Sequence, residues 1–326
     1  NTLNAQMGKD GAPTIYNIGN MSGLKDWDEY ALDLTGTALA GELATNDFNL
    51  YNEAGELKAM GYCYESFGII VNTKLLADAG HSLDEIKDFA SLKAVADDIH
   101  ARAAELGFDA FSSAGLDGSS SWRFSGHLAN MPLYYEFRDD GVTAQPATIT
   151  GAYLENFKNI WDLYTTDSAT TGAALATATG DESEAEFGEG KAAFYQNGTW
   201  EYSNLTGTFG MDPADLAMIP IYCGVDGEEK AGLCAGTENC WAINNEASEE
   251  DIQATIDFLV WVVTSDEGTT MLAQEFGPCP FKDAKEPENV FFQDANKYTA
   301  DGKYVVTWAF NWTPAVDDWR AAVVDA

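Results

Sequence analysis

Short apolar runs alternate with segments of helical periodicity along most of this chain of 326 residues. The runs have the length of single strands, which predicts strands at residues 14–18, 67–71, 192–195, 217–222 and 241–244. Between them, apolar side chains recur every three or four residues, and this spacing predicts helices within residues 92–106, 153–164 and 252–263. Ser248 and Ser265 each precede acidic residues, a pattern typical of a helix start. Strands that alternate with helices indicate an α/β fold.

The length and charge of the chain limit its organisation and its partners. A chain of 326 residues that is 45% hydrophobic is too long for one small core, and we expect two lobes. The chain has 17 Lys and Arg against 53 Asp and Glu, a formal net charge of −36. A surface this acidic repels phosphate backbones and anionic lipids, so we expect no nucleic-acid or membrane-surface partner. An anionic ligand is disfavoured, whereas a polyamine remains compatible with the charge.

The sequence offers no sign of a metal, a cofactor or a catalytic centre. Its five cysteines contain no CxxC pair and its three histidines are widely spaced, so we expect no zinc site. Cys223 and Cys234 flank a turn-like segment and could face each other across a hairpin, either as free thiols or as a disulfide. Known nucleophile, phosphate-loop, zinc-protease and dinucleotide motifs are missing from the sequence. Among 53 carboxylates, a glycosidase pair cannot be identified.

Four segments combine aromatic residues with short polar ones and are expected to be loops. They are residues 62–66, 117–122, 197–200 and 308–314. A sugar ring has an apolar C–H face that matches an indole or a phenol, and a rim of hydroxyls that Asn, Asp and Glu can bind. Each aromatic side chain could instead cover the core, where aromatics are common. Their position in loops with polar neighbours favours a saccharide site for the set.

Five segments, in order along the chain, resemble one protein family. The most specific begins at Phe187, reads FGEGKAAFYQNGTW and resembles the pattern F-x-x-G-K-A-A-M-x-x-N-G-x-W. The other four are residues 5–16, 66–76, 236–244 and 258–268. Together they resemble the carbohydrate-type extracellular solute-binding proteins of bacterial ABC importers, which include maltose-binding protein. Thr14 stands where the family usually has Asp, and Val71 where it has an aromatic residue.

The resemblance implies a two-lobed periplasmic-binding-protein-like fold of type II, with a ligand cleft between lobes that crossing hinge segments join. It places the first crossing near residues 111–115. Lobe I would comprise residues 1–112 and 241–289, and lobe II residues 113–240 and 290–326. Relatives usually begin with a further strand–helix–strand unit and continue for a helix or two, so we expect the natural protein to be longer at both ends. At the N-terminal end we expect a secretion signal, with a lipid-anchored cysteine if the host is Gram-positive. We therefore expect a periplasmic or cell-surface location.

The resemblance also implies the residues that contact the ligand. Trp200 would be the stacking aromatic of the NGxW motif, and Trp122 would follow the first crossing. Asn20 follows the first strand in a loop that usually points into the cleft in relatives, and Tyr64 and Glu65 precede a helix at its mouth. The remaining candidates are Asp117, Thr237 and Trp312.

The implied function is the capture of an oligosaccharide, without chemical change, by a monomer that docks on the permease subunits of an ABC importer. No catalytic residue, metal or cofactor is assigned. One alternative keeps the fold and replaces the sugar with a polyamine, a peptide or another small solute. A second alternative is a glycoside hydrolase.

Overall fold

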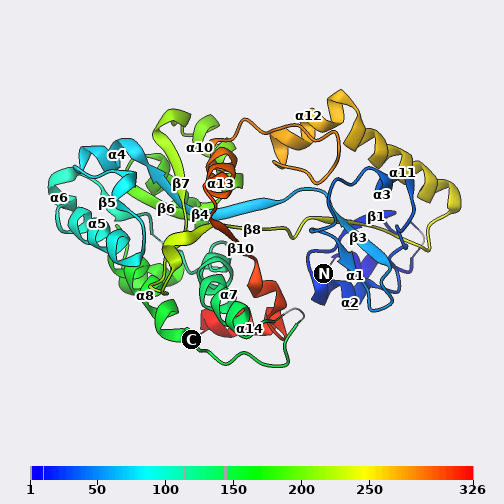
Figure 1. Cartoon of the computed structure of the whole chain (residues 1–326), viewed down its shortest axis with the longest axis horizontal. Helices are drawn as coiled ribbons and strands as arrows, with labels where there is room; N and C mark the ends of the chain where they lie inside the picture. The colour runs from blue at the N-terminus through cyan, green and yellow to red at the C-terminus, as the bar shows by residue number, and fades with distance from the viewer. Residues whose placement is uncertain (1, 10, 114, 143–144, 326) are drawn as a thin grey trace. The chain divides into compact units, whose positions relative to one another are not determined.

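The computed structural model describes residues 2–9, 11–113, 115–142 and 145–325 (Figure 1). The chain divides into two compact units, and each is built from two separate stretches. Unit 1 comprises Asn1–Glu65 and Gly236–Glu288, and unit 2 comprises Ser66–Ala235 and Asn289–Ala326. The chain therefore passes between the units three times.

The first of these passages differs from the prediction. We expected it near residues 111–115, whereas it lies between Glu65 and Ser66. The reason is strand pairing, because β4 (Glu65–Asn72) pairs with β6 (Ala192–Gly198), and β5 (Asp109–Phe111) pairs with the other edge of β6. Residues 66–112 therefore belong to unit 2. The other two passages lie at 235/236 and 288/289, and the lobe boundaries implied by the resemblance lie at 240/241 and 289/290.

Unit 1 contains an antiparallel sheet of four strands in the order β1-β9-β3-β2. The strands are β1 (Ile15–Asn17), β9 (Cys240–Ile243), β3 (Leu57–Gly61) and β2 (Leu50–Tyr51). Its helices are α1 (Thr2–Gln6), α2 (Met21–Trp27), α3 (Ala38–Gly41), α11 (Glu249–Thr264) and α12 (Asp266–Glu275).

Alternation along β9 explains why helices cover both faces of this sheet. Cys240 and Ala242 are buried in a cluster with residues of α1 and α2. Ile243 is buried in a second cluster with α3 and α11, and Trp241 packs against that cluster. Figure 1 shows α3 and α11 above the strands of unit 1 and α1 and α2 below them.

Unit 2 contains a mixed sheet of six strands in the order β10-β8-β4-β6-β5, with β7 also paired to β4. β5–β6 and β8–β10 are parallel, whereas β4 is antiparallel to β6 and to β7. The remaining strands are β7 (Leu216–Ile219), β8 (Ala231–Gly236) and β10 (Tyr304–Thr307). Its α-helices are α4 (Thr73–Asp78), α5 (Phe89–Ala101), α6 (Ala103–Leu106), α7 (Ala129–Asp139), α8 (Leu154–Thr166), α9 (Gly180–Gly188), α10 (Tyr202–Gly207), α13 (Val290–Ala300) and α14 (Val316–Asp325).

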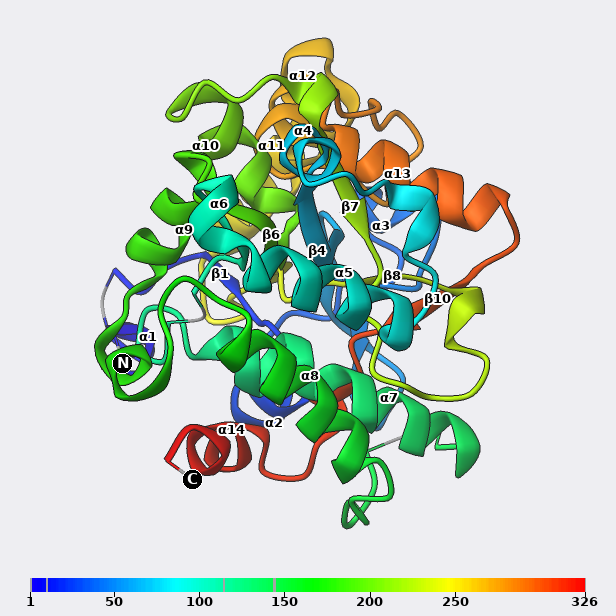
Figure 2. The ribbon, with the colours of Figure 1, turned by 90° about the vertical axis from the view of Figure 1, so that its left-hand side faces the viewer.

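Both faces of the unit 2 sheet are also covered, which is why β4 and β6 are almost continuously apolar. Phe67, Ile69 and Val71 of β4 join a large core with α5, α7 and α8. In Figure 2, α5 crosses in front of β4, and α7 and α8 lie below it. Ile70, which points to the opposite face, joins a core with α9, α10 and α13.

Short 3₁₀-helices and one π-helix connect these elements. The π-helix η2 (Arg123–Leu128) continues directly into α7. The 3₁₀-helices are η1 (Leu83–Glu85), η3 (Gly172–Thr177), η4 (Thr199–Glu201), η5 (Pro213–Asp215), η6 (Glu228–Lys230) and η7 (Ala309–Trp312).

The predicted elements are confirmed. Helices α8 and α11 cover two of the periodic segments, and the third, residues 92–106, is divided between α5 and α6. Strands β1, β4, β6, β7 and β9 cover the five apolar runs to within a few residues. Ser248 and Ser265 cap α11 and α12, accepting hydrogen bonds from the backbone N–H of Asp251 and Gly268. Along the described residues, no helix combines the length and apolar character needed to cross a membrane.

All five cysteines are free thiols, so the disulfide alternative for Cys223 and Cys234 is wrong for this structure. The Cys234 Sγ lies instead 3.6 Å from the Met131 Sδ. Burial raises the pKa of the thiols, to about 12 for Cys240 and Cys279, so thiolate chemistry is suppressed.

Candidate ligand-binding site

The eight predicted site residues divide equally between the two units. Unit 1 holds Asn20, Tyr64, Glu65 and Thr237, and unit 2 holds Asp117, Trp122, Trp200 and Trp312.

Trp200 lies on η4, at the point where the buried strand β6 ends, and its position depends on Gly198. A Cβ atom on Gly198 would overlap the six-membered ring of the Trp200 indole. Glycine at this position therefore lets the indole lie directly on the backbone. The NGxW motif thus sets the place of the aromatic ring, which is half-buried.

Trp122 and Trp200 lie together, with ring centroids 6.1 Å apart and planes inclined by 53°. His127 packs against both indoles, with its ring centroid 4.9 Å from that of Trp122 and 5.5 Å from that of Trp200. His127 also stacks on Phe67 at 3.9 Å. Complete burial lowers the pKa of His127 well below its usual value, so the imidazole is neutral. The two half-buried indoles therefore rest on an uncharged, rigid base.

Asp117 supports Trp122 through the turn that precedes it. The Asp117 carboxylate accepts hydrogen bonds from the Ser119 backbone N–H at 2.9 Å and from the Ser119 hydroxyl at 2.6 Å. The Ser119 carbonyl in turn accepts from the Trp122 indole N–H at 2.9 Å. The Asp117 carboxylate therefore stabilises the turn that precedes Trp122.

Trp312 lies on η7 and is 37% exposed. Trp308, at the start of the same segment, is buried and packs beside Phe67, on which His127 stacks. The Trp308 ring lies 5.5 Å from Phe67. Its buried indole N–H has no hydrogen-bond partner among the described residues. The sequence analysis selected Trp312. Trp308, which directly follows β10, is the buried tryptophan of this segment.

Glu201 is a functional candidate that sequence reasoning missed, although it directly follows Trp200. The Asn197 amide donates to the Glu201 Oε1 at 2.8 Å. Burial, with the nearby Glu184 charge, raises the pKa of Glu201 to about 8. The position of Glu201 directly after the Trp200 of the NGxW motif was the one signal in the sequence that pointed to it.

In unit 1, Glu65 and Thr237 are joined through Asn239. The Asn239 side-chain N–H donates to the Glu65 Oε2 at 3.0 Å, and the Asn239 backbone N–H donates to the Thr237 Oγ1 at 2.9 Å. Burial, and to a lesser extent Glu238, raises the pKa of Glu65 to about 7. These residues flank two of the three passages between the units.

Tyr64 and Asn20 have local structural roles in unit 1. Tyr64 stacks on Phe48, with ring centroids 4.7 Å apart and planes inclined by 7°. Asn20 caps α2, since its side-chain oxygen accepts from the Gly23 backbone N–H at 2.9 Å. The Tyr64 hydroxyl and the Asn20 amide N–H remain the parts of these side chains with ligand-binding chemistry.

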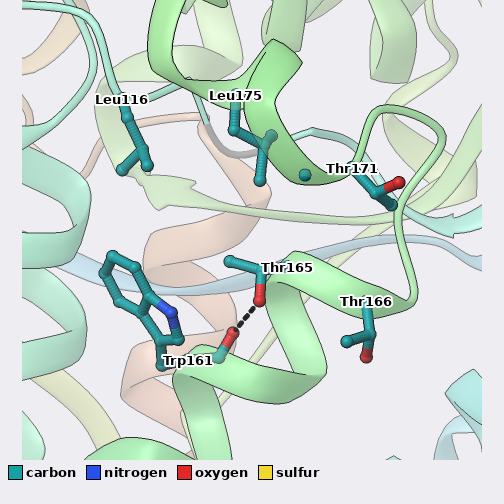
Figure 3. Close-up of a pocket in the computed structure, with 7 residues that line it drawn as sticks. Leu116, Trp161, Thr165, Thr166, Thr171 and Leu175 are labelled. Atoms are coloured by element: carbon teal, nitrogen blue, oxygen red, sulfur yellow. Dashed lines mark hydrogen bonds between the residues drawn. The ribbon is translucent and has the colours of Figure 1, made fainter.

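A separate pocket of about 530 Å³ lies in unit 2. Figure 3 shows its lining, which is Leu116, Trp161, Thr165, Thr166, Thr171, Gly172 and Leu175. The hydroxyls of Thr165 and Thr166 donate to backbone carbonyls within α8. This lining offers few polar partners to a hydroxyl-rich ligand, so the Trp122–Trp200 region remains the better candidate. Across the described residues, no cluster of His, Cys, Asp and Glu is arranged to hold a metal ion.

Comparison with known proteins defines the class. The sequence profile described as bacterial extracellular solute-binding protein matches residues 1–314. The chain belongs to this family of extracellular solute-binding proteins. No curated protein matches its sequence.

Three solved structures illustrate the similarity in fold. A family 1 extracellular solute-binding protein from Bifidobacterium longum subsp. infantis is 19% identical, with a TM-score of 0.65 over 99% of this chain and 83% of that one. The solute-binding protein RafE, in complex with raffinose, is 12% identical, with a TM-score of 0.77 over 99% and 83%. A sugar transporter protein from Bacillus licheniformis, in complex with stachyose, is 15% identical, with a TM-score of 0.68 over 99% and 82%.

Proposed function

We propose that this protein captures an oligosaccharide outside the cell and presents it, unchanged, to the membrane subunits of an ABC importer. The observation that carries the proposal is the Trp122–Trp200 pair, two half-buried indoles 6.1 Å apart at the end of a buried strand. Indole faces suit the C–H faces of sugar rings. The raffinose and stachyose complexes of proteins with the same fold support a saccharide ligand.

Polar groups of unit 1 are proposed to contact the same ligand. Glu65 and Thr237, with Asn20 and Tyr64, offer carboxyl, hydroxyl and amide groups of the kind that bind sugar hydroxyls. The three passages at 65/66, 235/236 and 288/289 would act as the hinge. Periplasmic binding proteins are a standard example of hinge closure around a ligand. Closure requires that the ligand bind the closed form more tightly than the open form.

The experiment is isothermal titration calorimetry of the full-length protein against raffinose, stachyose, other oligosaccharides, spermidine and short peptides. We expect saccharide binding in the micromolar range, about 8 kcal/mol. Chromatography of the recovered ligand should show no new product, which separates a binding protein from a glycoside hydrolase. Binding of spermidine or peptide with none of any saccharide would contradict the proposal.

A further inference from the structure

A second cavity of unit 2, with a volume of about 390 Å³, lies between α13, β7 and the segment around η1. Small-molecule sites in proteins commonly have volumes of roughly 300–1,000 Å³. None of the eight predicted ligand-binding residues lines this cavity. It is therefore separate from the Trp122–Trp200 region.

The floor of the cavity is buried and mostly apolar. Its members come from the end of η1, from β7 and from the segment after β7, and they are Ile86, Ala217, Met218, Ile219 and Tyr222. Contact with such a floor removes an aliphatic side chain of a ligand from water, which favours binding.

One face of α13 forms a charged wall above this floor. Asp294, Lys297, Tyr298 and Asp301 follow each other at the spacing of one helix face, and all four line the cavity. The Asp294 Oδ2 accepts a hydrogen bond from the Met218 backbone N–H at 2.8 Å. No hydrogen bond within the described residues reaches its Oδ1, and burial raises the pKa of this carboxyl group. A partly desolvated carboxylate with a free oxygen is a suitable partner for an ammonium group.

Three lysines line the same cavity, although the chain has a net charge of −36. They are Lys87, Lys297 and Lys303. Eight Lys and Arg side chains of the described residues form ion pairs with Asp or Glu, and none of these three is among them. The Lys303 ammonium donates to the Glu229 carbonyl. The ammonium groups of Lys87 and Lys297 are therefore available to a carboxylate ligand.

Tyr222 supplies a buried polar group without a partner. Its side chain is 4% exposed and lines the cavity, and its hydroxyl forms no hydrogen bond within the described part of the chain. Burial raises the pKa of Tyr222, so the phenol is neutral and can both donate and accept. Buried polar groups are normally hydrogen-bonded, and a polar ligand in the cavity would supply the missing partner.

We propose that this cavity binds a small zwitterion with an apolar side chain, namely an amino acid or a dipeptide of the leucine type. The ammonium group of the ligand would bind Asp294, its carboxylate would bind Lys87 and Lys297, and its side chain would cover the apolar floor. This inference goes beyond the proposed function and does not depend on it.

The lining disfavours the other classes of small ligand. A diamine would meet three lysines, and a dianion would meet the four carboxylates of the lining, Asp84, Glu229, Asp294 and Asp301. A saccharide would find no exposed aromatic face on Tyr222, which is buried. Only a ligand with both charges is matched by both sets of side chains.

The test is isothermal titration calorimetry of the full-length protein with leucine, leucyl-leucine and two blocked derivatives. N-acetylleucine lacks the ammonium group, and leucinamide lacks the carboxylate. We expect leucine or leucyl-leucine to bind, and each blocked derivative to bind at least roughly tenfold more weakly than leucine, the effect of losing a charged hydrogen bond. Absence of binding by both zwitterions, or equal binding of the blocked forms, would overturn the inference.

Two pairs of variants locate the site. Asp294→Asn keeps an oxygen that accepts from the Met218 N–H and should weaken binding roughly 10–100-fold. Asp181→Asn, the same charge change at an exposed position of α9, should bind as wild type. Lys297→Gln should weaken binding roughly 2–5-fold, and its control Lys158→Gln, on α8, should not.

Circular dichroism checks that each variant folds, and the lysine pair decides the question if Asp294→Asn does not. Equal affinities within each pair of variant and control would show that the zwitterion binds elsewhere, and the inference would be wrong.

A competition experiment separates this inference from the proposed function. Saturating saccharide should leave the affinity for the zwitterion unchanged, because the two ligands use different residues. Displacement of the zwitterion by saccharide would show a shared site and refute the inference. If no saccharide binds, the proposed function fails, while the titrations with leucine and leucyl-leucine still decide whether this cavity is a site.

Discussion

The indole of Trp200 lies so close to the backbone of Gly198 that a single added methyl group at position 198 would overlap its six-membered ring. The glycine and the tryptophan of the NGxW motif therefore form one structural unit. Glycine supplies the space, and the 3₁₀ turn of η4 brings the ring back over it.

Gly198→Ala should displace the Trp200 indole and weaken saccharide binding by roughly 1–3 kcal/mol, the loss associated with an unstacked aromatic contact. Calorimetry measures this loss. Gly207→Ala is the matched control, since its Cβ would meet no atom within 4 Å. Equal affinities for the two alanine variants would contradict the role assigned to Gly198.

Trp200→Ala and Trp122→Ala should each weaken saccharide binding by roughly 1–3 kcal/mol, a range taken from bases stacked on aromatic side chains. Trp261→Ala serves as the control, because Trp261 is 45% exposed on α11 in unit 1. If Trp200→Ala lowered the melting temperature and left the affinity unchanged, the ring would be a core residue and no ligand contact.

Glu65 should make the stability of unit 1 fall as pH rises. Burial raises its pKa to about 7 in the folded protein, above the ordinary value of 4.5. Between pH 4.5 and 7, Glu65 is ionised in the unfolded chain but still protonated in the folded protein, and this difference favours unfolding. The free energy of unfolding therefore declines from about pH 4.5 to 7 and is constant above. Glu65→Gln, whose oxygen still accepts from Asn239, should remove up to about 3 kcal/mol of this decline. Urea denaturation at pH 5, 6, 7 and 8 measures it.

The control for Glu65 is Glu246→Gln, a change of the same charge at an exposed position of unit 1. It should leave the pH dependence as in wild type. A Glu65→Gln profile that runs parallel to wild type would show that the buried carboxyl is not the titrating group.

All five cysteines should be alkylated in the unfolded protein without any reductant, because none is in a disulfide. In the folded protein, labelling should be slow, since burial raises the thiol pKa values. Mass spectrometry counts the labels. Three labels without reductant and five with it would reveal a disulfide, with Cys223 and Cys234 as the first pair to examine.

The sequence predicted the local elements well, because periodicity and caps are local properties. The stripe and the Ser248 cap of α11 identify that helix without reference to the rest of the chain. The first passage between units was misplaced because it depends on which strand β4 pairs with, and its partner β6 begins at Ala192. No local pattern near Glu65 carries that information.

The site residues stay predictions. Trp200 was chosen through its NGxW motif and Trp122 through its place after the expected first crossing, and the structure brings the two rings together although that crossing lies elsewhere. Glu201 was not found, because among 53 carboxylates only the fold identifies this one as half-buried and bound by Asn197. Trp308 and Trp312 lie too close in sequence for spacing alone to tell which of them turns inward.

The strand order of unit 1 has a consequence for biosynthesis. β9 lies between β1 and β3, yet it follows β3 by almost the whole length of unit 2. During synthesis, β1 and β3 therefore emerge long before the strand that joins them, and the edges that β9 covers stay unpaired while residues 66–235 of unit 2 are made. The unit 1 sheet can therefore be completed only late in synthesis, after most of the chain has been made.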